Sequence, residues 1–180
     1  GLNLKATLIG DDSLSKRPMS RVVDPLILMG KEISTNNGKA PIQIIRGNIK
    51  DNFEYFMPVA SAQVKSSLML AALSSGNSIK ITEPKVTRDH TERMIQYLDG
   101  SIEILESSQD KTIFLKSSKL SKISSYEVVG DFSSAAFIIV AVLISKNSEV
   151  LIKNVGLNKT RSGLLEILLK MKANIEIVNK

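Results

Sequence analysis

The chain contains 180 residues, of which 43% are hydrophobic, 23% charged and 4% aromatic. This composition predicts a soluble globular protein of one compact domain or two small ones, and it excludes a disordered or collagen-like chain. The sequence has no cysteine, which excludes disulfides, a thiolate nucleophile and a zinc–thiolate site. Its single histidine, His90, excludes a multi-histidine metal cluster.

The charge balance is 24 basic against 18 acidic residues, a net charge of +6. Such an excess favours an anionic partner, either nucleic acid or a phosphorylated small molecule. A lysine-rich solvated surface is the alternative, because the lysines form no run and few aromatic side chains are available to stack on bases. No apolar run approaches the ~20 residues that span a membrane, and the N-terminus lacks the apolar core of a secretory signal. We therefore expect a cytoplasmic protein without a membrane partner.

Three segments along the chain share one pattern: a strand, a short polar loop with a cation, and an amphipathic helix. The pattern predicts strands at 5–10, 78–84 and 149–155, and helices at 19–30, 90–100 and 161–172. Alternating apolar residues after the helices predict further strands at 42–45, 102–104, 112–115 and 175–177.

A second kind of helix is predicted at 61–74 and at 133–145. Both segments begin with small hydroxyl residues that cap helices, and both are apolar nearly all round, so we expect them to be buried on every side. The repeating unit is then a buried helix, a strand, an outer helix and two strands, about 70 residues long. The chain begins and ends within such a unit, which predicts that it is a piece of a larger protein.

Arg17 is the first residue that suits an anion, because it precedes a helix that starts beside Pro18 and it can aim its guanidinium across a cleft. The alternative is a surface arginine paired with a nearby carboxylate. Ser61-Ala62-Gln63 is the second candidate, since the start of a buried helix offers backbone N–H groups, a hydroxyl and an amide to a phosphate. The alternative there is that Ser61 only caps its own helix. Lys65, one turn further in, needs a partner if it is buried.

Arg88, at the head of the next outer helix, is the third candidate, suited to a bidentate grip on phosphate or carboxylate. Its neighbours Asp89 and Glu92 suit the first turn of that helix electrostatically, a structural role. Asp131 is typical of a cap for the second apolar helix. The sequence contains no glycine-rich phosphate loop, no dinucleotide-binding fingerprint and no serine-nucleophile elbow.

Four motifs taken together resemble one family. The segments GDDSLSKRPMSRVVDPLILMG, MPVASAQVKSSLMLAAL, TEPKVTRDHTERMI and VVGDFSSAAFIIVA are similar, in this order and spacing, to the middle of the EPSP synthases, the 3-phosphoshikimate 1-carboxyvinyltransferases. The SAQVKS and TRDHTE forms resemble the glyphosate-tolerant bacterial class. One departure is Met171-Lys172-Ala173, where the family usually has Met-Gly-Ala.

The resemblance implies an α/β (α+β) fold of repeated helix–strand units, with buried helices inside and sheets outside, the inside-out α/β barrel of enolpyruvyl transferases. It implies that residues 1–128 are part of a first globule, which binds shikimate-3-phosphate. Residues 129–180 would form the hinge and the start of a second globule. The chain would thus be a central fragment of a full-length enzyme that is monomeric.

The resemblance also implies the site. Arg17 would bind phosphoenolpyruvate, Ser61 and the Ala62 backbone would hold the 3-phosphate of shikimate-3-phosphate, Gln63 would touch both substrates, and Arg88 would grip shikimate-3-phosphate. The implied reaction is an addition–elimination in the shikimate pathway to chorismate and the aromatic amino acids. It needs no metal or organic cofactor. The residues that transfer protons would lie outside this chain, so the fragment by itself would be inactive.

Two alternatives differ in class from this enzyme. One is the sister family, the UDP-N-acetylglucosamine enolpyruvyl transferases, which share the architecture but not the phosphoshikimate-side motifs. The other is a non-catalytic module that binds anions or RNA, since a related fold serves RNA-processing enzymes. The scarcity of aromatic residues argues against RNA.

Overall fold

The computed structural model describes residues 4–107 and 110–178. The chain divides into two compact units, Gly1–Lys122 and Ile123–Lys180. The boundary expected from the sequence, between residues 128 and 129, lies a few residues after this division. The assignment of the two parts to two globules of a larger enzyme stays a prediction.

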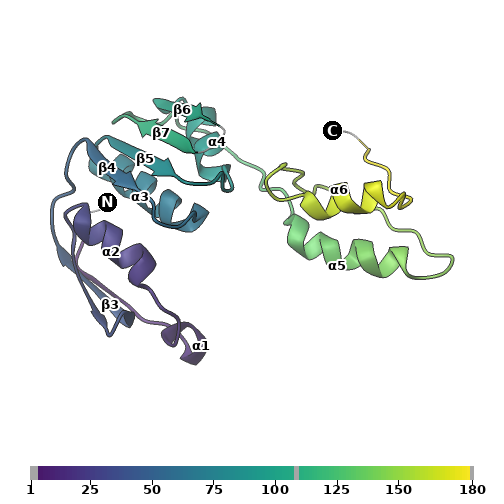
Figure 1. Cartoon of the computed structure of the whole chain (residues 1–180), viewed down its shortest axis with the longest axis horizontal. Coiled ribbons are helices and arrows are strands. Elements are labelled where there is room, and N and C mark those ends of the chain that lie inside the picture. The colour runs from purple at the N-terminus through teal and green to yellow at the C-terminus, as the bar shows by residue number, and fades with distance from the viewer. Residues whose placement is uncertain (1–3, 108–109, 179–180) are drawn as a thin grey trace. The chain divides into compact units, whose positions relative to one another are not determined.

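The first unit contains two sheets, seen in Figure 1. An antiparallel sheet of order β1-β3-β2 is built from β1 (Ala6–Leu8), β2 (Glu32–Asn36) and β3 (Lys39–Arg46). A mixed sheet of order β4-β5-β7-β6 is built from β4 (Phe53–Phe56), β5 (Ile79–Glu83), β6 (Ile102–Glu106) and β7 (Lys111–Leu115). In this second sheet β4 runs parallel to β5, and the other pairs are antiparallel.

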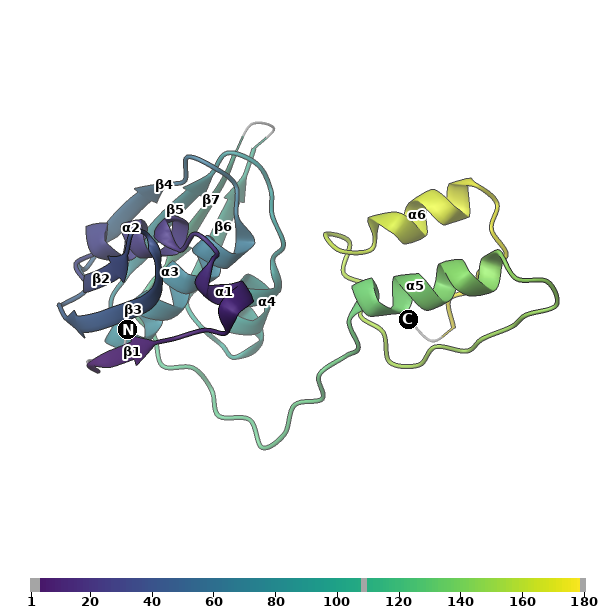
Figure 2. The ribbon, with the colours of Figure 1, turned by 90° about the horizontal axis from the view of Figure 1, so that it is seen from below.

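Four helices accompany these sheets: α1 (Asp12–Ser15), α2 (Ser20–Leu28), α3 (Ala62–Ser75) and α4 (His90–Tyr97). Helix α3 packs against both α2 and β5, and Figure 2 shows it in the interior of the unit. The core is lined by apolar side chains from these elements: Met29, Ile49, Met57, Val64, Leu68, Met69, Ala71, Ala72, Ile79, Ile81, Ile95, Ile113 and Leu115. The burial predicted for the helix at 61–74 is confirmed on most of its circumference.

Local chemistry sets both ends of α3. Ser61 has an extended backbone, and its side chain accepts a hydrogen bond from the backbone N–H of Val64 at 3.4 Å, as an N-cap does. At the other end Gly76 adopts a left-handed conformation with φ of 71°, which terminates the helix without the strain a side chain would bring. The cap predicted at Ser61 is therefore present.

The second unit contains α5 (Phe132–Leu143) and α6 (Gly163–Lys170), which lie side by side in both Figure 1 and Figure 2. Asp131 caps α5 as predicted, accepting a hydrogen bond from the backbone N–H of Ser133 at 3.0 Å. This bond and the nearby Arg161 guanidinium hold the pKa of Asp131 below its usual value. None of the helices within the described residues is long and apolar enough to cross a membrane.

Two predictions for this second unit are wrong. The segments 149–155 and 175–177 are not strands, because the described part of the unit offers them no neighbouring strand; only an isolated bridge joins Gly130 to Val155. Helix α5 is not buried on every side, since Phe137 is 81% exposed and Ile138 is 50% exposed. The helix is apolar enough for a core, but the described residues of its unit supply too little apolar surface to cover it.

Candidate functional site

The N-terminus of α3 gathers three of the residues expected to bind substrate. Ser61 and Ala62 are half-buried and Gln63 is exposed. The first N–H groups of a helix have no acceptor within the helix, and the helix dipole places partial positive charge at this end. With the Ser61 hydroxyl and the Gln63 amide beside them, these groups make an end that is suited to a phosphate.

Helix α2 contributes a cation to the same place. The Arg21 guanidinium donates a hydrogen bond to the side-chain oxygen of Gln63 at 3.2 Å. Sequence reasoning missed Arg21, which lies in the first turn of α2, four residues after Arg17. The contact orients the Gln63 amide and adds positive charge beside the α3 N-terminus.

Arg17 lies in the turn between α1 and α2, where its backbone N–H donates to the carbonyl of Leu14 at 3.1 Å. Its side chain is exposed, and within residues 4–107 and 110–178 it forms no hydrogen bond or ion pair. The carboxylate partner of the alternative interpretation is therefore not seen in the described residues. Arg17 precedes α2, the helix that carries Arg21.

Arg88 lies in a loop that Glu83 holds in place. Residues 84–89 form neither helix nor strand. Glu83, the last residue of β5, accepts hydrogen bonds from the Thr87 backbone N–H at 3.3 Å and from the Thr87 hydroxyl at 2.6 Å. Arg88 is half-buried, and among the described residues its guanidinium has no protein partner, so it is available to an anion.

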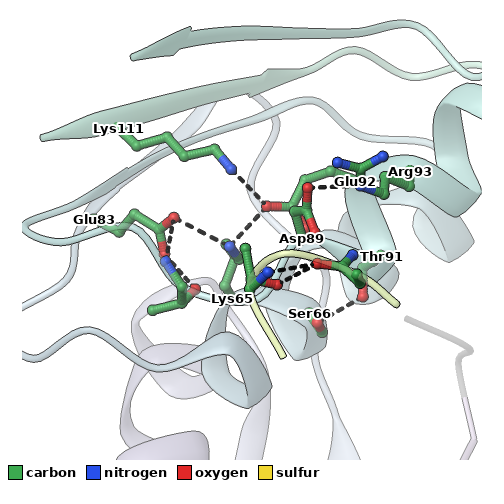
Figure 3. A network of polar contacts seen from close by, with 11 residues as sticks. Lys65, Ser66, Glu83, Asp89, Thr91, Glu92, Arg93 and Lys111 are labelled. Atoms are coloured by element: carbon green, nitrogen blue, oxygen red, sulfur yellow. Dashed lines mark hydrogen bonds and ion pairs between the residues drawn. The ribbon is translucent and has the colours of Figure 1, made fainter. Parts of the chain in front are cut away.

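A buried charged network, drawn in Figure 3, connects α3 to this loop and to α4. The Lys65 ammonium group lies 3.1 Å from a carboxylate oxygen of Glu83 and 2.7 Å from one of Glu92. The Lys111 ammonium group lies 3.4 Å from the same Glu92 oxygen. All four side chains are at most 4% exposed. Lys65 thus has the partners that its burial requires, and its role is internal.

Among the described residues, one carboxylate oxygen of the network lacks a hydrogen-bond partner, and a nearby hydrogen bond adds a second link between α3 and α4. The second carboxylate oxygen of Glu92 has no hydrogen-bond partner among the described residues. Close by, the hydroxyls of Ser66 and Thr91 share a hydrogen bond of 2.6 Å, which ties α3 to α4 a second time. At the head of α4, Asp89 pairs with Arg93 at 2.7 Å. Glu92 is buried rather than placed on the helix surface, so its role is structural, as expected, but through this network.

The predicted site residues are therefore brought together in part. Ser61, Ala62 and Gln63 lie at one helix end, and Arg88 is linked to that helix through Thr87, Glu83 and Lys65. Cations and free helix N–H groups of this kind suit phosphorylated and carboxylated ligands.

Comparisons with known proteins show which family the chain resembles. The family model of EPSP synthase (3-phosphoshikimate 1-carboxyvinyltransferase) matches residues 1–180. The chain is 46% identical to the 3-phosphoshikimate 1-carboxyvinyltransferase of Legionella pneumophila (strain Lens), over 96% of this chain and 39% of the relative. It is 45% identical to the protein of the same name from Petrotoga mobilis, over 99% of this chain and 41% of the relative.

The fold is similar to that of a solved structure of EPSP synthase from Acinetobacter baumannii. The TM-score is 0.79 at 37% identity, over 98% of this chain and 39% of that one. The α/β fold expected from the sequence is thus confirmed, and the chain spans about two fifths of the length of its relatives. On the match over all its residues, the chain belongs to the EPSP synthase family.

Proposed function

We propose that this chain supplies the shikimate-3-phosphate-binding part of an enzyme that transfers the carboxyvinyl group of phosphoenolpyruvate to the 5-hydroxyl of shikimate-3-phosphate. The observation that carries the proposal is the family match over the whole chain, which includes the α3 N-terminus and the Arg88 loop. The cytoplasmic location and the monomeric state of the full-length enzyme stay predictions.

Each candidate residue has a role that its chemistry supports. Ser61 and the backbone N–H of Ala62 bind the 3-phosphate, at the positive end of α3. Arg88 adds a charged contact to shikimate-3-phosphate, and Gln63 reaches both substrates. Arg17 binds phosphoenolpyruvate, and its exposed, unpaired guanidinium suits a small dianion.

The reaction proceeds by addition and elimination. A proton adds to the methylene carbon of phosphoenolpyruvate, and the 5-hydroxyl oxygen bonds to the adjacent carbon as its own proton leaves. The tetrahedral adduct then expels inorganic phosphate while the methyl carbon loses a proton, which restores the carbon–carbon double bond. Two anionic substrates have to be held side by side, so the site needs several cations and oriented N–H groups. The groups that move the protons are supplied by the rest of the full-length enzyme.

Isothermal titration of the full-length protein with shikimate-3-phosphate tests these roles. Arg88→Ala should weaken binding roughly 10- to 100-fold, because a hydrogen bond to a charged group contributes about 1.5–3 kcal/mol. Arg17→Ala should leave this binding nearly unchanged but raise the KM for phosphoenolpyruvate. Arg46→Ala is the control, since Arg46 pairs with Glu32 on an exposed face of the first sheet.

Two results would contradict different parts of this proposal, the reaction and the role of Arg88. A parent protein that releases no phosphate from the two substrates would contradict the proposed reaction. An active parent whose Arg88→Ala variant binds shikimate-3-phosphate as tightly as before would make Arg88 a helix-end cation only.

A further inference from the structure

The charged network under the candidate site is an unusual way to hold a core together. A buried ion pair recovers little more than the cost of removing its charges from water, and apolar side chains of similar volume often stabilise a fold as well. The network formed by Lys65, Glu83, Glu92 and Lys111 occupies the space where α3, α4 and the ends of β5 and β7 meet. Hydrogen bonds and ion pairs have preferred distances and directions, so they fix the separation of these elements more closely than apolar contacts do.

One path through the network joins the two halves of the candidate site. Lys65 lies four residues after Ser61, in the first turns of α3, and its ammonium group bonds to Glu83. Glu83 in turn accepts both hydrogen bonds from Thr87, whose neighbour is Arg88. The helix end that would hold the phosphate is thus connected by two consecutive links, Lys65 to Glu83 and Glu83 to Thr87, to the residue before the arginine that would grip the same ligand.

We propose that Glu83 is a positioning residue, which sets Arg88 relative to the N-terminus of α3 through its contacts with Lys65 and Thr87. This inference rests on the proposed function, because it assumes that both elements bind shikimate-3-phosphate. Because its side chain is fully buried, Glu83 would act without contacting the substrate. It acts because residues 84–89 have no regular backbone pairing, so the position of Arg88 depends on side-chain tethers.

The expected effect is large because misplacing a binding group by about 1 Å can cost as much as 100-fold. The contact between Glu83 and the Arg88 loop is easiest to weaken at Thr87. Thr87→Val keeps the shape of the side chain but removes the hydroxyl that bonds to Glu83 at 2.6 Å, and it leaves the charges of the network untouched. Thr87→Ser restores a hydroxyl at that position.

A matched control exists on the opposite face of the same sheet. The hydroxyls of Thr112 on β7 and Thr82 on β5 lie 3.2 Å apart, directly opposite in the strand register. Because side chains alternate along a strand, Thr112 points away from the face that carries Lys111. Thr112→Val is therefore the same chemical change, with loss of one hydroxyl contact, at a place that does not support Arg88.

The experiment measures the KM and Kd for shikimate-3-phosphate, the KM for phosphoenolpyruvate and the Tm of the full-length enzyme. Thr87→Val should raise the KM and Kd for shikimate-3-phosphate roughly tenfold, with the KM for phosphoenolpyruvate changed less than about twofold. Thr87→Ser should return both to within about twofold of the parent. Thr112→Val should lower the Tm comparably and leave the KM and Kd unchanged.

Each remaining outcome overturns the inference. If Thr87→Val binds shikimate-3-phosphate as the parent does, or if Thr112→Val weakens binding equally, Glu83 is only a structural residue. If Thr87→Val loses affinity for shikimate-3-phosphate and Thr87→Ser does not restore it, the effect comes from the side-chain volume and not from the hydroxyl. A parent without affinity for shikimate-3-phosphate overturns the proposed function itself, whereas a binding parent with an unaffected Thr87→Val variant overturns this inference alone.

Discussion

Lys65 lies one turn into a helix whose other buried side chains are apolar, and its ammonium group is fully shielded from solvent. A charge in such a place needs compensation, which Glu83 and Glu92 provide at 3.1 and 2.7 Å. The three residues come from α3, β5 and α4. A single buried side chain thus holds three elements of the first unit together.

Removing that charge should strongly destabilise the first unit. Lys65→Met keeps the length of the side chain but leaves two buried carboxylates, of which Glu92 retains Lys111 as a partner at 3.4 Å. We expect a loss of about 3–5 kcal/mol in the free energy of unfolding, measured by urea denaturation followed by circular dichroism.

Lys80→Met is the matched control for this change. Lys80 pairs with Glu54 at the surface and lies over the Phe114 ring, and its side chain is 34% exposed. A surface pair of this kind should cost about 1 kcal/mol. Equal losses in the two variants would mean that the buried network contributes no more than an ordinary surface contact.

The sequence predicted that Lys65 needs a partner but did not identify it. A signal for Glu83 was present, because alternation along the strand puts it in phase with the buried Ile79 and Ile81. Lys111 is in phase with Ile113 and Leu115 in the same way. Which carboxylate meets which ammonium group depends on how β5, β7 and α4 pack in three dimensions, and periodicity along one strand contains no information on that packing.

At the scale of elements, the C-terminus of α6 shows what one substitution does to a turn. Lys172 follows the C-cap Met171 with φ of 61°, in the left-handed region that glycine occupies without strain. Glycine is the residue that the family resemblance leads us to expect at this place. Here a lysine adopts the left-handed backbone conformation, which is strained for a residue with a side chain.

Lys172→Gly should therefore stabilise the chain. The left-handed conformation costs an L-residue about 1–2 kcal/mol, and part of that gain is lost to the greater freedom of glycine in the unfolded chain. We expect a net gain of about 0.5–1 kcal/mol in the free energy of unfolding, measured by urea denaturation.

The opposite substitution at another helix end, from glycine to lysine, gives the control. Gly76 ends α3 with φ of 71°, and a Cβ added at this position would have its nearest heavy atom 3.8 Å away, on Ser117. Gly76→Lys therefore adds backbone strain without a collision and should destabilise by a similar amount. No change of stability at either position would show that these turns relax without cost.

The elements that sequence reasoning found are those with a strong periodic pattern. Helix α3 and strands β5 and β7 formed where they were predicted, because each buries an apolar face within its own unit. The short strand β4 was missed, since four residues carry little periodicity, and α1 was read as a loop. The strand predicted at 149–155 did not form, because an alternating segment becomes a strand only beside another strand.

At the scale of the whole chain, one copy of the predicted repeating unit is complete within the described residues. The succession α3, β5, α4, β6 and β7 is the predicted unit in full, with its sheet and its buried helix. The second unit has the corresponding helices α5 and α6, but no named strand lies in its described residues. This difference explains why the first unit has a core and why α5 exposes Phe137 and Ile138.

The division into two units predicts where a protease cuts first. Residues 116–129 form neither helix nor strand. Ser121 is still attached to the first unit, since its backbone N–H donates to the Leu98 carbonyl at 2.8 Å and its hydroxyl to the Asp99 carboxylate at 2.5 Å. Lys122 is the first basic residue beyond these contacts, and it is exposed.

Limited trypsin digestion of the chain should therefore cut first after Lys122, because cleavage requires an exposed segment that opens locally without unfolding a core. Mass spectrometry should find residues 1–122 as the resistant product. In the Lys122→Ala variant this first cut should be slowed, whereas Lys80→Ala, a change within β5, should leave it at the parent's rate. If cleavage instead starts within α3 or β5, and no product ending at Lys122 survives, the first unit is not the more stable part and the contrast between the two units drawn from their cores is wrong.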